Sequence, residues 1–260
     1  IWHNNVKIIS SKQLKRHLHI VDAEDTSGRI IVASPYSIKG ASKEVNEDST
    51  GILSIKYCGD TVTLFHVFAI ADGVSSLHGG EYASSFSVRS FILGTLPLIN
   101  AVNTNIKNYL RELIMEIHAE LQDYAVKNNV NVGTTFTGGV ITQSGNIAAA
   151  TIVHIGDSRA YKIVDNTVNR ITSDHSLGGH VITQALGYVI NNIDVYETMI
   201  GRNTYLILTT DGITDVVPDD MIGRIVHEYK YPRYISWTLV NSAEKLGTRD
   251  DETVLTIWRN

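Results

Sequence analysis

Residues 68–73 read Phe68-Ala69-Ile70-Ala71-Asp72-Gly73, an apolar run that ends directly on an aspartate and a glycine. The arrangement recurs in Val153-His154-Ile155-Gly156-Asp157-Ser158 and in Leu206-Ile207-Leu208-Thr209-Thr210-Asp211-Gly212. Such runs predict buried β-strands. A single aspartate after a strand is usually a turn residue. Three such endings instead predict carboxylates that neighbouring strands bring together.

Other segments extend this pattern of strands. Runs rich in β-branched and apolar residues predict strands at 30–32, 62–70, 136–142, 147–155, 161–164, 205–209 and 254–258. Asp165-Asn166 separates 161–164 from 167–171, and both residues tolerate the left-handed conformation of a tight hairpin turn. This spacing predicts antiparallel pairing of the two flanking segments.

Four segments have helical character. Apolar residues recur at three- and four-residue spacing in 104–127, and 80–93 is rich in small residues. Segments 218–229 and 232–246 each begin with proline, which suits the first turn of a helix. Because the strands come in groups around helical pairs, the pattern favours packed antiparallel sheets flanked by helices over a doubly wound parallel sheet.

Length and composition indicate one globular domain. The chain has 260 residues, 43% of them hydrophobic, and a formal net charge of -5 without the basic run that nucleic acid binding needs. No stretch approaches the roughly 18 apolar residues of a membrane helix. The single cysteine, Cys58, excludes an internal disulfide and fits a reducing compartment. We therefore expect a cytoplasmic, monomeric protein with no nucleic acid partner and no membrane segment.

The repeated aspartates point to a cation site. Carboxylates gathered in a partly buried place repel one another unless cations lie among them. Ligation by oxygen alone favours Mg²⁺ or Mn²⁺ over Zn²⁺. The glycines after Asp72 and Asp211 allow close turns and let a backbone carbonyl reach a metal. Two further acidic groups, at 46–48 and 250–252, are either additional ligands or solvated surface.

The resemblance that decides between these alternatives rests on eight short motifs in a fixed order. They are Gly40-Ala41-Ser42-Lys43-Glu44-Val45-Asn46-Glu47-Asp48, Ala71-Asp72-Gly73-Val74, Gly133-Thr134-Thr135, Ile155-Gly156-Asp157-Ser158-Arg159-Ala160-Tyr161, Asp174-His175-Ser176, Ala185-Leu186-Gly187, Thr210-Asp211-Gly212 and Asp250-Asp251-Glu252-Thr253-Val254. Together they resemble the metal-dependent protein phosphatases of the type 2C class, over most of residues 29–258. Val74 stands where eukaryotic members usually carry histidine, which indicates a bacterial or archaeal type.

The resemblance implies an α+β fold, a four-layer α/β/β/α sandwich of two antiparallel sheets flanked by helices. Residues 29–260 would form the type 2C-like catalytic domain. Residues 1–28, which show no clear period, would form an N-terminal extension or edge element.

The resemblance also implies a site for two Mn²⁺ or Mg²⁺ ions, with a weaker third ion. The metal ligands it assigns are Glu47, Asp48, Asp72, Gly73, Asp157, Asp211 and Asp250. Asp72 would bridge both ions, and the Gly73 carbonyl would bind one of them. Asp211 and Asp250 would ligate the other. Glu47 or Asp48 would complete the shell directly or through water, and Asp157 would help hold the third ion.

The activity that the resemblance implies is hydrolysis of phosphoserine and phosphothreonine in proteins, opposite a cognate protein kinase system. A metal-bridged water would attack phosphorus in line, without a covalent intermediate. Catalytic roles fall to Asp72 and Asp211, and to Lys43 as the group that grips the phosphate. The absence of a Gly-x-Ser-x-Gly elbow agrees with this mechanism, because no side-chain nucleophile is needed.

Three departures from the family pattern bear on function. Lys43 replaces the usual arginine and offers a point charge instead of a bidentate fork. Asp251 replaces the usual asparagine, and the sequence leaves open whether it is a ligand. Only eight residues, 177–184, stand where the family commonly inserts a longer flap. We therefore hypothesise a more open site with broad peptide tolerance.

Several alternatives stay open at this stage. His175 and His180 are candidate proton donors to the leaving group, although structural hydrogen bonding is the simpler role for His175. Gly133-Thr134-Thr135 and Arg159 are predicted to act structurally, the first by beginning a buried strand and Arg159 by pairing with a core carboxylate. A catalytically weak or dead relative that serves as a regulatory binding module is the main alternative function, and a sporulation- or stress-type regulatory phosphatase is a third. Retention of the aspartates favours an active enzyme.

Overall fold

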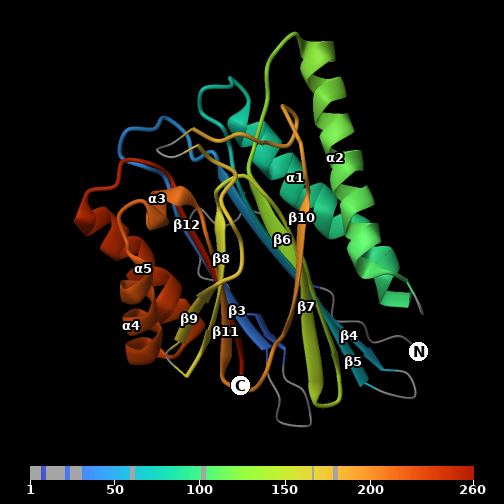
Figure 1. Cartoon of the computed structure of the whole chain (residues 1–260), viewed down its shortest axis with the longest axis vertical. Coiled ribbons are helices and arrows are strands. Elements are labelled where there is room, and N and C mark those ends of the chain that lie inside the picture. The colour runs from blue at the N-terminus through green and yellow to red at the C-terminus, as the bar shows by residue number, and fades with distance from the viewer. Residues whose placement is uncertain are drawn as a thin grey trace.

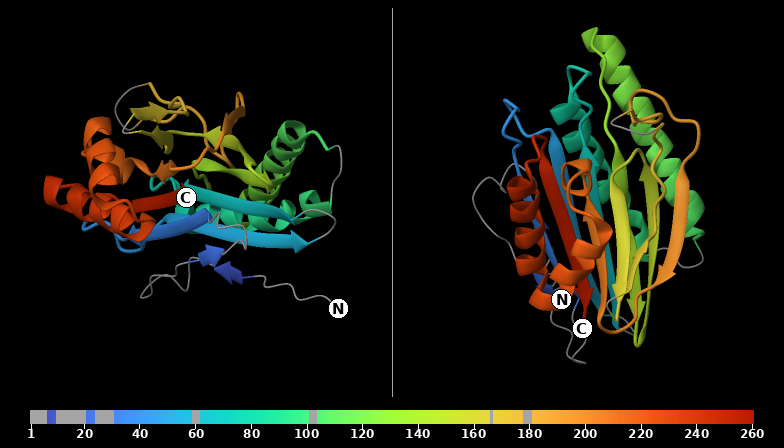
Figure 2. Two further views of the ribbon diagram at one scale, coloured as in Figure 1. Left: turned by 90° about the horizontal axis from the view of Figure 1, so that it is seen from below. Right: turned by 60° about the vertical axis from the view of Figure 1, so that its left-hand side comes forward.

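The computed structural model describes residues 7–9, 21–23, 31–58, 62–100, 104–165, 167–177 and 181–260. Two antiparallel sheets lie face to face, with helices on both outer faces (Figure 1). Figure 2 shows the same layers from two further directions, with α4 and α5 on one side of the strands and α1 and α2 on the other. The predicted α+β sandwich is confirmed.

The first sheet has the strand order β1-β4-β5-β6-β7-β10, and every neighbouring pair is antiparallel. Its strands are β1 (Lys7–Ile9), β4 (Asp48–Cys58), β5 (Val62–Asp72), β6 (Phe136–Ser144), β7 (Ile147–Ile155) and β10 (Asp194–Met199). The longest ladder joins β4 to β5 over their full lengths. This ladder carries the central part of the first sheet.

The second sheet has the strand order β2-β3-β12-β11-β8-β9, again antiparallel throughout. Its strands are β2 (Val21–Ala23), β3 (Ile31–Ile38), β12 (Glu252–Arg259), β11 (Thr204–Thr209), β8 (Arg159–Val164) and β9 (Thr167–Arg170). The predicted hairpin between β8 and β9 is confirmed: Val164 pairs with Thr167, and Asp165 has φ 45°. Asn166 lies outside the described residues.

The helices follow the predicted segments closely. They are α1 (Gly80–Gly94), the 3-10 helix η2 (Leu96–Asn100), α2 (Ile106–Asn128), α3 (Asp211–Thr214), α4 (Asp219–Tyr229) and α5 (Pro232–Leu246). The Asn105 side chain accepts a hydrogen bond from the Asn108 backbone N–H and caps the start of α2. Asn129, in the left-handed conformation, ends the helix. The short elements η2 and α3 were not predicted.

Strand β5 explains why residues 67–71, directly before Asp72, are all apolar. Phe68 and Ile70 belong to the core between the two sheets, whereas Val67, Ala69 and Ala71 belong to the core under α1 and α2. Successive side chains of a strand point to opposite faces, so both faces of β5 are buried. A third core packs α4 and α5 against the outer face of the second sheet.

Strands β4 and β10 are absent from the sequence-based prediction, and β3 is longer than predicted. β4 opens with polar and small residues that serve packing. Gly51 leaves room for α1, since a Cβ there would lie 2.5 Å from Ile92 Cδ1, and Ser49 shares a hydrogen bond with Ser84 of α1. In β3, Pro35 lies beyond Ala33, the last residue that pairs with β2 in the described part of the chain, and a strand tolerates proline on a side without such pairing.

The N-terminal region contributes two edge strands. β1 pairs with β4 and β2 pairs with β3, each at the edge of its sheet. Most of residues 1–28 lies outside the described residues, so the domain boundary after residue 28 stays a prediction. Within the described part of the chain, no helix has the length and apolar character needed to cross a bilayer.

Two buried histidines make the fold sensitive to acid. Burial lowers the pKa of His66 to about 4, and burial followed by the neighbouring His175 lowers that of His154 to about 4. Below the ordinary histidine pKa of about 6.5, these two histidines bind protons in the unfolded chain but stay neutral in the folded protein. Stability is therefore lost as pH falls from about 6.5 towards 4.

We predict that lowering the pH from 7.5 to 5 costs about 2 kcal/mol of unfolding free energy through His66 alone. His66→Gln removes the titrating group, so its unfolding free energy should fall by that much less over the same interval. Urea unfolding of both proteins at each pH measures the difference. Equal pH dependence in the two proteins would contradict the assignment.

Candidate active site

Two of the predicted carboxylates are direct neighbours at one end of the first sheet. Asp48 is the first residue of β4, Asp72 is the last residue of β5, and the two are register partners. In an antiparallel pair, the start of one strand and the end of the next lie at the same edge. The ladder therefore places Asp72 beside an aspartate from a segment where no strand was predicted.

The second sheet brings two more aspartates to the same end. Asp211 opens α3 two residues after β11 ends, and Asp250 lies two residues before β12 begins. The Asp211 carboxyl group lies near enough to raise the pKa of Asp72, so side chains from the ends of the two sheets meet here. In Figure 1, α3 marks this end of the sandwich.

The Thr210 hydroxyl ties the sheets together beside these carboxylates. Thr210 Oγ1 donates a hydrogen bond of 2.9 Å to Asp48 Oδ2 and accepts one of 3.0 Å from the Thr253 backbone N–H. The Thr210 N–H in turn donates to the Thr253 carbonyl at 3.1 Å. Thr210 and Asp48 are both buried. The sequence signal was present in the Thr-Asp-Gly motif, but its structural role was not predicted.

Burial and mutual repulsion disfavour the charged forms of the carboxyl groups in this cluster. Burial, followed by repulsion from Asp48 and Asp211, raises the pKa of Asp72 well above its ordinary value. Burial also raises the pKa of Asp48, with repulsion from Asp251 and Asp211 adding to it. Asp48 Oδ1 is buried and has no hydrogen-bond partner among the described residues. Such a group gains most from a shared proton or a cation.

Asp157, the third predicted strand end, lies near the same cluster. Burial, followed by the charges of Asp211 and Asp174, raises its pKa to about 7. The preceding Gly156 has φ +100°, and a Cβ there would lie 2.7 Å from Thr135 side-chain atoms. Glycine is therefore required at the turn that delivers Asp157.

The backbone around Asp72 is held by the Gly133-Thr134-Thr135 motif. Thr134 Oγ1 and the Thr135 N–H both donate to the Asp72 carbonyl at 2.8 Å, and the Asp72 N–H donates to Thr135 Oγ1 at 3.0 Å. A Cβ on Gly73 would lie 2.4 Å from the Gly80 carbonyl carbon. The motif acts structurally, as predicted, and Gly73 allows two backbones to approach closely.

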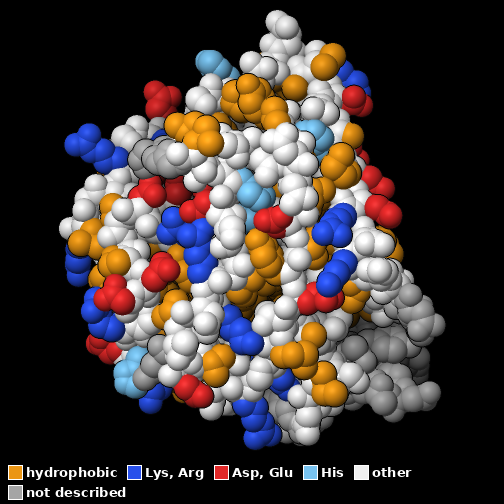
Figure 3. All heavy atoms as spheres, viewed as in Figure 1, with side chains coloured by type: hydrophobic (Ala, Val, Ile, Leu, Met, Phe, Trp, Pro, Cys, Tyr) orange, Lys and Arg blue, Asp and Glu red, His pale blue; other side chains and the backbone are white. Residues whose placement is uncertain are grey.

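The donor set fits a hard divalent cation. The groups that converge are carboxylate and carbonyl oxygens, which Mg²⁺ and Mn²⁺ prefer. The described residues nevertheless contain no preassembled group of three acidic, histidine or cysteine ligands. Two of the candidate ligands, Glu47 and Asp250, contact Lys43 instead. Figure 3 shows acidic and basic side chains side by side on this face near α3.

A family model described as protein phosphatase 2C matches residues 41–248. The chain belongs to that family. The match covers the strand ends, α3 and the loop that carries Lys43, and it confirms the resemblance drawn from the eight motifs.

Bacterial relatives agree with this assignment. The serine/threonine phosphatase Stp of Listeria welshimeri is 26% identical over 247 residues, which cover 85% of this chain and 93% of that protein. Protein phosphatase PhpP of Streptococcus pneumoniae is 27% identical over 215 residues, or 74% of this chain and 85% of PhpP. The structure of Stp1 from Staphylococcus aureus superposes with a TM-score of 0.74 at 24% identity, covering 87% and 94% of the two chains, and supports the fold.

In this member of the 2C family, Lys43 stands between two candidate ligands. Its Nζ lies 2.8 Å from Asp250 Oδ1 and 3.3 Å from Glu47 Oε2. The Ser75 hydroxyl contacts Lys43 Nζ and donates to Glu47 Oε2 at 2.5 Å. Burial opposes the lysine charge, but the hydrogen bond to Asp250 and then that to Glu47 outweigh it and raise the pKa of Lys43. Ser75 was not predicted at the site.

Asp251, the second departure from the family pattern, holds the loop that carries Lys43. Asp251 Oδ1 accepts the Gly40 N–H and Oδ2 accepts the Glu47 N–H, both at 2.8 Å. The residue is 2% exposed. Both carboxylate oxygens are thus engaged by backbone donors, which makes Asp251 a structural clamp between residues 40–47 and the start of β12.

His175 also has a structural environment. Its Nδ1 accepts the Gly156 N–H at 3.2 Å, and its Nε2 lies 3.2 Å from Asp194 Oδ2. With both ring nitrogens engaged, His175 supports the turn before Asp157 and is a poor candidate for a proton donor to substrate. Arg159 pairs with Asp174 at 2.8 Å, as predicted for a carboxylate, but Asp174 is partly exposed and lies outside the core. His180 lies outside the described residues.

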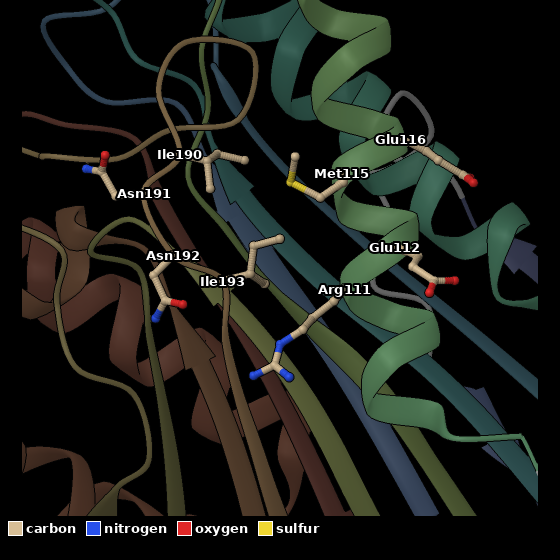
Figure 4. Close-up of a pocket in the computed structure, with 8 residues that line it drawn as sticks. All are labelled: Arg111, Glu112, Met115, Glu116, Ile190, Asn191, Asn192 and Ile193. Carbon is tan, nitrogen blue, oxygen red and sulfur yellow. The ribbon is translucent and has the colours of Figure 1, made fainter.

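A separate groove of about 670 Å³ runs between α2 and residues 190–193. Figure 4 shows its lining: Arg111, Glu112, Met115, Glu116, Ile190, Asn191, Asn192 and Ile193. None of the candidate metal ligands lines it. The groove is therefore distinct from the carboxylate cluster.

We predict that Asp251→Asn destabilises the protein by about 1–3 kcal/mol, because the amide NH₂ would face one of the two backbone N–H donors. Thermal and urea unfolding of both proteins without added metal would measure the loss. Asp123→Asn, on the exposed face of α2, is the matched control and should leave stability unchanged. Wild-type stability in Asp251→Asn would exclude the clamp.

Proposed function

We propose that this member of the 2C family is an active protein phosphatase that hydrolyses phosphoserine and phosphothreonine with Mn²⁺ or Mg²⁺. The observation that carries the proposal is the convergence of Asp48 and Asp72, register partners in the first sheet, with Asp211 at the end of the second, whose charge raises the pKa of Asp72. Carboxylates gathered at a partly buried sheet junction cost stability unless positive charge is shared between them. A binding module would have no need to keep such a cluster.

The ligand assignments extend this proposal residue by residue. Asp72 would hold two ions, and the Gly73 carbonyl would be the backbone ligand of one of them. Asp211 and Asp250 would hold the second ion. Between the two alternatives for the remaining position, Asp48 is favoured as the direct ligand, since its Oδ1 is buried without a described partner.

The remaining candidate ligands take outer positions in this proposal. We assign Glu47 to ligation through water, because the Ser75 hydroxyl donates a hydrogen bond to its Oε2. Asp157, with a pKa near 7, would hold the weaker third ion only after losing its proton.

The side chains divide the chemistry between them. When bound, the ions would activate a water for in-line attack on phosphorus and neutralise the phosphoryl oxygens. Lys43 would supply the positive charge that holds the phosphate of the substrate. Asp72 and Asp211, fixed by the strand ends, keep the reacting groups at the junction of the sheets.

The domain boundary, the oligomeric state, the location and the kinase partner are proposed from the sequence. We place the catalytic domain at residues 29–260 and expect a monomer that acts on cytoplasmic phosphoproteins against a cognate kinase. A regulatory binding module is the competing function. Retention of Asp48, Asp72, Asp211 and Asp250 at one junction disfavours it, because a pure binding module gains nothing from repelling carboxylates.

We predict that p-nitrophenyl phosphate and a phosphothreonine peptide are hydrolysed with Mn²⁺ or Mg²⁺ and not with EDTA. Asp211→Asn should lower kcat/KM about a hundredfold or more, because it removes a metal ligand. Asp220→Asn, an equal charge change on the exposed face of α4, should retain wild-type turnover. Folded wild-type protein without turnover in either metal would favour the binding module.

We further predict broad tolerance among phosphopeptides. The segment between Ser176 and Ala185 has eight residues, so few side chains are available to contact residues that flank the phosphate. Across a panel of phosphothreonine peptides with varied flanking residues, kcat/KM should vary by no more than about tenfold. Variation by several hundredfold would show that other parts of the site select the sequence.

A further inference from the structure

The contacts of Lys43 suggest a role beyond holding phosphate. We propose that Lys43 is an internal counter-ion, whose ammonium group and a divalent cation exclude each other at Asp250 and Glu47. Metal binding would then release the Lys43 side chain towards the substrate phosphate. The inference rests on the proposed function, because it assumes that the carboxylate cluster binds a divalent cation.

The geometry supports competition for the same oxygens. Lys43 Nζ lies 2.8 Å from Asp250 Oδ1 and 3.3 Å from Glu47 Oε2, both within ion-pair distance. Both carboxylates come from the proposed metal ligands, one on the loop before β4 and one before β12. A divalent cation that took either oxygen would lie within a few ångströms of the ammonium and repel it.

The third contact explains why lysine is suited to this position. An ammonium group has three donors around one nitrogen, and Lys43 has three acceptors, namely Asp250, Glu47 and Ser75. An arginine fork is planar and suited to two oxygens of one carboxylate or phosphate. The replacement of the usual family arginine by lysine therefore matches a group that must satisfy several acceptors at once.

The surrounding loop is held in place, so the exchange needs only the side chain to move. The Lys43 N–H donates to the Gly40 carbonyl at 3.2 Å, and Lys39 Nζ donates to that same carbonyl at 3.0 Å. The Ser42 hydroxyl donates to the Arg249 carbonyl at 2.7 Å. With the backbone fixed, the four-carbon stem of Lys43 can swing from the carboxylates to a phosphate without unfolding the loop.

One functional consequence is an order of binding. While Lys43 pairs with Asp250 and Glu47, its charge is compensated and contributes little to phosphate binding. Once a metal binds Asp250 directly and Glu47 through water, the freed ammonium joins the ions as a second positive group for the phosphate. Metal should therefore bind before the phosphoprotein, and inorganic phosphate should bind measurably only when Mn²⁺ is present.

The direct test is Mn²⁺ binding by isothermal titration calorimetry to wild type and Lys43→Met, without substrate. Removal of the competing cation should tighten Mn²⁺ binding about three- to tenfold, an effect the size of a partly buried ion pair. Arg249→Met, which removes one positive charge from an exposed side chain beside Asp250, should change the affinity by less than about twofold. Unchanged or weaker Mn²⁺ binding by Lys43→Met would overturn the proposal.

A second measurement uses the wild-type protein, and so does not depend on the folding of a variant. Acylation of lysines by an amine-reactive ester is followed by peptide mass spectrometry, with Lys39 as the internal reference. Addition of Mn²⁺ should raise the acylation of Lys43 relative to Lys39 several-fold, because the amine is released from its carboxylates. Equal or lower acylation of Lys43 in Mn²⁺ would contradict the release.

The two proposals fail in different ways. If the wild type hydrolyses phosphopeptides with Mn²⁺ but Lys43→Met binds Mn²⁺ no more tightly, the counter-ion role is wrong and the phosphatase stands. If the wild type neither binds Mn²⁺ nor turns over, the proposed function fails and the counter-ion role fails with it.

Discussion

The repulsion between carboxylates at the junction of the two sheets is the constraint on which the rest of this structure depends. Asp48 and Asp72 come from the first sheet, Asp211 from the end of the second, and each is held by backbone geometry that it cannot easily leave. The protein opposes that repulsion with specific devices. Thr210 donates a hydrogen bond to Asp48, and Lys43 neutralises part of the charge nearby through its ion pair with Asp250. The clustered carboxylates lower the stability of the fold, and the three apolar cores around them compensate for this loss.

Much of the fold could be predicted because β5 is buried on both faces and therefore reads as an unbroken apolar run. The same reasoning fails for β4. Gly51 and Ser49 suit the contact of this strand with α1, and strand propensity does not account for them. No local pattern reveals that a missing side chain makes room for Ile92. Pro35 similarly makes β3 appear shorter in the sequence than it is. Whether a strand tolerates proline at this position depends on where β2 stops pairing with β3.

For the site, the sequence identifies the carboxylates but not the groups that manage their charge. The aspartates stand out because they follow strands or occur in ordered motifs. The clamp made by Asp251 joins positions more than 200 residues apart, and neither Gly40 nor Glu47 carries a mark of that contact. Ser75 and Thr210 are ordinary hydroxyl residues until the fold brings them beside a carboxylate. Long-range polar contacts of this kind depend on tertiary structure alone.

The position of β12 has a consequence for how the protein is made. This strand lies between β3 and β11, yet it comes from residues 252–259, far along the chain from β3. During synthesis, β3 and β11 are made before β12, the strand that lies between them. The contacts of Asp251 with the loop before β4 likewise cannot form until Asp251 has been made. The carboxylate cluster therefore depends on contacts of long sequence separation, which close slowly. It is incomplete until residue 250 and the second sheet are in place.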